Sequence, residues 1–79
     1  MHKKEILEYL EAEIIGTEKL LVLTEASYRA LQSLQIKYPK DQNILANFTK
    51  VGRDKSSLQS KLTNLRGVAE EIKKGTLIF

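Results

Sequence analysis

Apolar side chains recur every three or four residues through the first half of the chain. From Glu5 to Tyr38 there is no proline and a single glycine, Gly16, and residues with good helix propensity dominate. The stripe contains Leu7, Leu10, Ile14, Thr17, Leu21, Thr24, Tyr28, Leu31, Gln35 and Tyr38. Because side chains at this spacing share one face of a helix, the pattern predicts a long helix over residues 4–37.

The second half of the chain carries a stricter version of this pattern. Spacings of four and three residues alternate through Ile44, Phe48, Val51, Lys55, Leu58, Leu62, Leu65, Ala69 and Ile72. Such a heptad repeat is typical of a coiled coil, in which a helix packs lengthwise on a partner helix. The polar stretch 52–57 has the composition of a turn, but Val51 and Leu58 keep the seven-residue spacing across it. We therefore expect one continuous helix over residues 43–74.

The segment YPKDQN, residues 38–43, separates the two patterns. Pro39 lacks a backbone N–H and disfavours helical geometry at Tyr38, so the first helix should end there. Either Asp41 or Asn43 can then cap the start of the second helix. A connection this short joins helices that are antiparallel neighbours.

These elements predict an all-α fold in which the whole chain is one helical hairpin of two long antiparallel helices. The arms are residues 4–37 and 43–74, the turn is 38–43 and the tail is 75–79. Gly75 follows two lysines and suits the end of the second arm. The apolar tail that follows it either folds back over the open end of a bundle or adds as a strand to a partner.

The first arm has more apolar surface than one partner helix can bury. A second apolar line, displaced around the helix, contains Leu20, Leu23, Ala30 and Leu34. A contiguous apolar patch left exposed on a protein marks an interaction site. We expect these residues to form a protein interface, covered by a second copy in a homodimeric four-helix bundle or by another helical protein.

Lys55 is the one charged residue among the seam positions of the second arm. A lysine at a seam position can set the register or the oligomeric state at a cost in stability. It can equally extend its ammonium group to solvent along an apolar stem. The sequence leaves both roles open.

Charge is distributed unevenly between the arms. Residues 1–39 contain five Lys/Arg and six Glu, a net charge of −1, whereas residues 40–79 contain eight Lys/Arg and four Asp/Glu, a net charge of +4. Oppositely biased segments can pair with each other, or the basic arm can bind nucleic acid or another polyanion. The candidate polyanion contacts are Lys50, Arg53, Lys61, Arg66, Lys73 and Lys74.

The sequence predicts no catalytic, cofactor or metal site. There is no cysteine, the single histidine is His2, and the four glycines are isolated, so thiolate metal sites and glycine-rich phosphate loops are not expected. The serines and threonines have no base at a matching spacing. The longest apolar run, Leu20 to Leu23, is four residues long, against roughly 20 for a membrane span. We expect a non-enzymatic cytoplasmic protein with no membrane span.

The segment PKDQNILANF, residues 39–48, lies between the two predicted helices. It resembles the turn of type III secretion needle subunits, in which a proline-containing turn precedes a Leu-Leu-Ala-like start of a long C-terminal helix. The matching residues are Pro39, Ile44, Leu45, Ala46 and Phe48, whereas the second proline common in that family is absent. The small helical-hairpin chaperones of the same systems are similar to this chain as well. The resemblance implies an alternative function as a subunit or chaperone of a bacterial secretion-type assembly.

Overall fold

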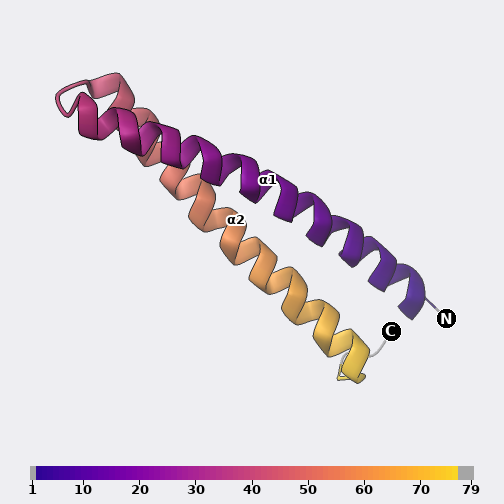
Figure 1. Ribbon diagram of the computed structural model, residues 1–79. Helices are drawn as coiled ribbons and strands as arrows, with labels where there is room; N and C mark the ends of the chain where they lie inside the picture. The colour runs from indigo at the N-terminus through magenta and orange to yellow at the C-terminus, as the bar shows by residue number, and fades with distance from the viewer. Residues whose placement is uncertain (1, 77–79) are drawn as a thin grey trace.

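The computed structural model describes residues 2–76 and folds them into two helices joined by a short turn (Figure 1). Helix α1 spans Lys3–Lys37 and helix α2 spans Gln42–Lys74. The helices run antiparallel, so α1 begins and α2 ends at the same end of the molecule. The molecule measures 57 × 17 × 14 Å. The predicted all-α helical hairpin is confirmed.

Two local signals in the sequence set the turn. Helix α1 ends before Pro39, and the N–H of Tyr38 donates the last bond to the carbonyl of Leu34 at 2.7 Å. The carboxylate of Asp41 accepts hydrogen bonds from the N–H groups of Asn43 and Ile44 at 3.0 and 3.1 Å. Asp41 is therefore the residue that caps α2, one of the two alternatives that the sequence left open.

The far end of α2 also follows its sequence signal. Gly75 adopts a left-handed conformation with φ 78°, and its N–H donates to the carbonyl of Ile72 at 3.1 Å. Only glycine adopts this conformation without steric cost, which explains why the helix ends here. The predicted contacts of the apolar tail fall on residues 77–79, which lie outside the described residues.

Helix α2 continues without interruption through residues 52–57, as the unbroken heptad spacing predicts. No strand occurs among the described residues. The predicted stripe of α1 and the heptad positions of α2 form the contact between the helices, because these are the positions at which exposure falls. We call this contact the seam. The exception is Tyr38, predicted as part of the stripe, which follows the end of α1 and is 48% exposed.

The seam is buried to different degrees along the hairpin. We call residues 20–58 the turn half, and residues 2–19 together with 59–76 the open half. The most buried side chains are Thr17, Leu62, Ala69 and Ile72, and all four lie in the open half. The hydroxyl of Thr17 donates to the carbonyl of Glu13 at 2.7 Å, so this buried polar group is satisfied. The other seam residues of the open half are half-buried, and in the turn half none of the seam residues is more than half-buried.

Candidate protein interface

The four residues predicted to form an interface lie together on a side of α1 that α2 leaves uncovered. We call Leu20, Leu23, Ala30 and Leu34 the leucine face. Leu20, Leu23 and Leu34 expose 51%, 66% and 42% of their surface, and Ala30 is exposed as well. Their spacings of three, four and seven residues place them on one side of the helix. The structure therefore brings the predicted residues together on the surface of the hairpin.

The leucine face adjoins the half-buried part of the seam. Leu20 lines a shallow surface groove with Thr24 of α1 and with Asp54 and Leu58 of α2. Further toward the turn, the rings of Tyr28 and Phe48 meet across the seam with centroids 4.9 Å apart. A partner bound to the leucine face would therefore also cover apolar surface that remains exposed along the seam.

Lys55 lies on the aromatic part of the seam. The side chain is half-buried, and its Nζ atom lies 4.6 Å from the centroid of the Tyr28 ring. A cation at this distance is attracted to the face of the ring. The sequence did not identify Tyr28 as the partner, although counting outward from the turn along both arms places Lys55 about one helical turn beyond the position opposite Tyr28. A role of Lys55 in setting register stays a prediction.

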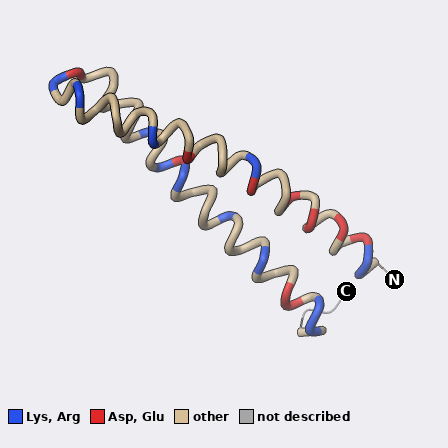
Figure 2. The backbone as a smooth tube through the Cα atoms, in the orientation of Figure 1, with Lys and Arg blue, Asp and Glu red and all other residues tan. Residues whose placement is uncertain are grey.

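Three ion pairs join the helices, all in the open half. Lys61 binds Glu13 with 3.3 Å between Nζ and Oε1, and Arg66 binds Glu18 with 2.9 Å between a guanidinium nitrogen and Oε1. The third pair is Lys73 with Glu11, at 4.0 Å. Figure 2 shows acidic residues gathered toward the start of α1, across from basic residues toward the end of α2. Each pair is about half exposed and is therefore worth little, about 0 to 1 kcal/mol.

These ion pairs bear on the predicted polyanion surface. Three of its six residues, Lys61, Arg66 and Lys73, contact glutamates of α1, as expected if the oppositely biased arms pair with each other. The other three, Lys50, Arg53 and Lys74, are exposed on α2. The structure thus divides the predicted cationic set instead of gathering it into one surface.

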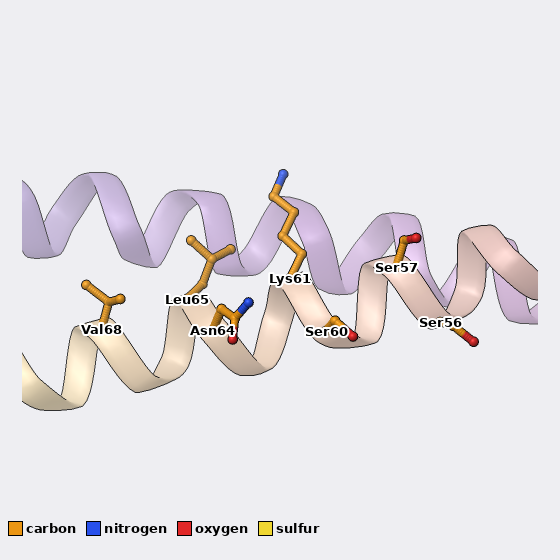
Figure 3. A pocket seen from close by; sticks show the side chains of 7 residues that line it. All are labelled: Ser56, Ser57, Ser60, Lys61, Asn64, Leu65 and Val68. Carbon is orange, nitrogen blue, oxygen red and sulfur yellow. The ribbon is translucent and has the colours of Figure 1, made fainter.

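A shallow groove follows one flank of α2 (Figure 3). Its lining consists of Ser56, Ser57, Ser60, Lys61, Asn64, Leu65 and Val68. Lys61 extends across the groove toward α1, where it bonds to Glu13. A nucleophilic hydroxyl needs a base within hydrogen-bond reach, and among the described residues no hydrogen bond joins Lys61 to these serines.

Two further features concern metal ions and membranes. Within residues 2–76, no group of three or more histidine, aspartate or glutamate side chains is placed to hold a metal ion. Neither of the described helices has a stretch that is both long and apolar enough to cross a membrane.

Helix α1 has a second exposed apolar row, which the sequence patterns did not predict. Ile15, Val22 and Ile36 expose 53%, 67% and 74% of their surface, and we call them the isoleucine row. They lie seven and fourteen residues apart along α1, so they share one line on the helix. This heptad spacing was the available signal, but Arg29 interrupts the row at the position between Val22 and Ile36.

Comparison of the chain with known protein-family models, with curated proteins and with solved structures gave no match in any of the three. The resemblance of residues 39–48 to secretion needle subunits is thereby neither supported nor refuted, and it stays a prediction. Function is therefore inferred from the surface of the hairpin.

Proposed function

We propose that this chain is a non-enzymatic interaction module, which self-associates through the leucine face so that two hairpins form a four-helix bundle. The observation that carries the proposal is the exposure of Leu20, Leu23 and Leu34 beside a half-buried seam. Contiguous exposed apolar surface of this kind is typical of interaction sites. A cytoplasmic location, predicted from the sequence, belongs to the same proposal.

The spacing within the leucine face favours a two-fold contact. Leu20 and Leu34 each lie seven residues from Ser27, and Leu23 and Ala30 lie between them on either side of it. If two copies of α1 pack antiparallel with Ser27 at the centre, Leu20 of one copy lies opposite Leu34 of the other. Leu23, four residues before Ser27, then lies within one residue of Ala30 of the other copy, which is three residues after Ser27. One self-complementary surface thus covers both copies, as in most homodimers.

The apolar surface of the leucine face sets the expected strength of the contact. Covering the exposed fractions of its three leucines contributes roughly 2 to 5 kcal/mol for each copy, and therefore roughly 5 to 10 kcal/mol for the two copies of a dimer. Association of two molecules costs an estimated 4 to 15 kcal/mol, which is of similar size. The half-exposed seam beside the face adds to the contact. We expect a contact whose population depends on protein concentration.

Charged substitutions on the leucine face test the proposal. Leu20→Glu and Leu23→Lys should each lower the mass measured by light scattering below that of the wild type, because a charge cannot enter an apolar contact without cost. Ser60→Glu is the matched control, since Ser60 is exposed on the other helix, α2, and is not a residue of the leucine face. If both leucine variants stay folded and keep the wild-type mass, the leucine face is not an interface.

A cysteine cross-link tests the proposed geometry. The chain has no cysteine, so Ser27→Cys introduces the only thiol. The two-fold contact places this residue opposite its own copy, and mild oxidation should give a covalent dimer in high yield. Ser60→Cys should cross-link far less under the same conditions. Equal yields from both variants would contradict the antiparallel contact centred on Ser27.

Two alternatives predict different results in the same measurements. If another helical protein covers the leucine face, the wild-type chain alone is a monomer at every concentration. If the basic surface binds a polyanion, affinity for nucleic acid falls steeply as salt rises, whereas an apolar contact responds little. Lys61, Arg66 and Lys73 already contact glutamates within the hairpin, which weighs against the polyanion alternative.

A further inference from the structure

We infer that the isoleucine row is a second self-association face, covered by another copy of this chain, so that dimers built on the leucine face assemble into units of at least four chains. The assembly of dimers rests on the proposed function. The contact through the row is a separate one, with its own residues and its own test.

The ion pairs show that the two apolar rows lie on opposite flanks of the seam. Glu13 and Lys61 pair on one flank, and Leu20 follows Glu13 by seven residues, so it lies on that flank too. Glu18 and Arg66 pair on the other flank, and Val22 follows Glu18 by four residues. At 3.6 residues per turn, the row lies about 120° around α1 from the leucine face. A copy bound to the leucine face therefore leaves the row uncovered.

The row has the spacing of a two-fold contact. With Arg29, its members lie at intervals of seven residues, symmetric about the point between Glu25 and Ala26. If two copies of α1 pack antiparallel about that point, Ile15 of each copy lies opposite Ile36 of the other. Val22 of each copy then lies opposite Arg29 of the other, so every position of the row has a partner.

The charges beside the row are complementary in this arrangement. In this arrangement Arg29 lies opposite Val22 of the second copy. Glu18 and Glu25 of that copy lie four residues before and three residues after Val22, so Arg29 lies between them. Within one hairpin, Arg29 pairs with Glu25 at 3.8 Å and Glu18 bonds to Arg66 at 2.9 Å, so Arg29, whose side chain is 77% exposed, would exchange its own Glu25 for Glu25 of the second copy and share Glu18 with Arg66. The aliphatic stem of Arg29 can cover Val22 while the guanidinium contacts the carboxylates. The residue that interrupts the row thus fits a second copy of the same chain.

The exposed apolar surface gives a further reason to expect a second contact. The residues of the row expose 53% to 74% of their surface, against 42% to 66% for the three leucines of the leucine face. A chain that associates through the less exposed surface therefore retains a more exposed one. Two different two-fold contacts on each chain lead to a closed tetramer or to a larger assembly, not to a dimer.

Sedimentation equilibrium of charged variants of the row tests this inference. Ile15→Lys and Ile36→Glu should each reduce assemblies of four or more chains to two chains, with the helical circular dichroism of the wild type as the folding control. Both positions are exposed in the hairpin, and Ile36→Gln removes the apolar side chain without adding charge. The double variant Ile15→Lys/Ile36→Glu should regain the larger assembly, because each lysine then lies opposite a glutamate. Absence of this rescue would overturn the antiparallel contact.

Combination with Leu20→Glu separates this inference from the proposed function. If both contacts exist, Leu20→Glu and Ile36→Glu each give two chains, and the variant with both changes gives single chains. A wild type that never exceeds two chains, with Leu20→Glu monomeric, would overturn the inference and leave the proposed function standing. If Leu20→Glu keeps the wild-type mass while Ile36→Glu lowers it, the proposed function fails and the row is a contact.

Discussion

The two halves of the hairpin differ in how far their seam residues are buried and in the residues at the edge of the seam. In the open half, Leu62 and Ile72 are buried, and the pair Glu13–Lys61 lies at the edge of the seam. In the turn half, seam residues such as Leu31 are half-buried, and the edge position seven residues after Glu13 is occupied by Leu20. The open half thus contains all the buried seam residues, although Leu10 and Leu65 there are half-buried as well, whereas the turn half has the features of a contact with one participant missing.

The seam positions of a heptad pattern and the positions beside them therefore carry separate information. Seam positions repeat along the whole length of both helices and determine that they pair. The edge positions change from charged at Glu13 to apolar at Leu20 and Leu34, although all three occupy the same heptad position. In coiled coils such edge positions set the choice of partner. The turn half is therefore where we expect another chain to bind.

The largest expected effect distinguishes the buried seam from the half-buried one. Leu62→Ala should lower the free energy of unfolding by about 2 to 5 kcal/mol at any protein concentration, because the site is buried within one hairpin. In dilute protein, Leu31→Ala should lower the free energy of unfolding by less than Leu62→Ala does. At concentrations where the hairpins associate, the loss caused by Leu31→Ala should increase. Urea unfolding followed by circular dichroism measures both. A loss below about 0.5 kcal/mol for Leu62→Ala would place the seam elsewhere.

The next largest effect is expected for the contact between Lys55 and Tyr28. A double-mutant cycle with Lys55→Met and Tyr28→Leu should give a coupling energy of about 0.5 to 2 kcal/mol for the cation on the ring. Lys55→Leu addresses register: it should broaden the range of oligomers seen by sedimentation if the lysine sets register. An unchanged association state together with higher stability would mean that the lysine only extends to solvent.

A smaller gain is expected in the open half at Gly67. A Cβ atom at this position meets no other atom within 4 Å, so alanine fits without rearrangement. Gly67→Ala should raise the free energy of unfolding by about 0.5 to 1 kcal/mol, because glycine in a helix interior is less favourable than alanine. Thermal unfolding measures this gain. A lower melting temperature for Gly67→Ala than for the wild type would show that a neighbouring chain packs against this position.

The smallest effect is expected for the ion pairs. Arg66→Gln should change the free energy of unfolding by no more than about 1 kcal/mol, because the arginine and Glu18 are both about half exposed. High salt should reproduce most of this small loss in the wild-type chain. A larger loss would mean that the pair is buried in an assembly, which would extend the interface into the open half.

The fold was predictable from sequence because its determinants act locally or periodically. Pro39, Asp41 and Gly75 end or begin helices by their own backbone chemistry, and the seam follows from spacing alone. The helices differ from the predicted arms by one residue, at Lys3 and at Gln42.

The details of the surface were less predictable. The position of the Lys55 ammonium on Tyr28 depends on side-chain packing across the seam, which spacing does not specify. The ion-pair partners depend on register in the same way. The leucine face was predicted as apolar surface, but the isoleucine row was not, since Arg29 breaks it. What covers either surface depends on contacts between molecules, which the periodicity of one chain does not describe.

The most direct test of self-association is sedimentation equilibrium of the unmodified chain over a wide concentration range, at low and at high salt. We predict a mass above the 9.0 kDa of one chain that rises with concentration and persists at high salt, because apolar contacts are not weakened by added ions. A mass of 9.0 kDa at every concentration and both salt levels would show that the hairpin is a monomer, and would contradict the proposed function.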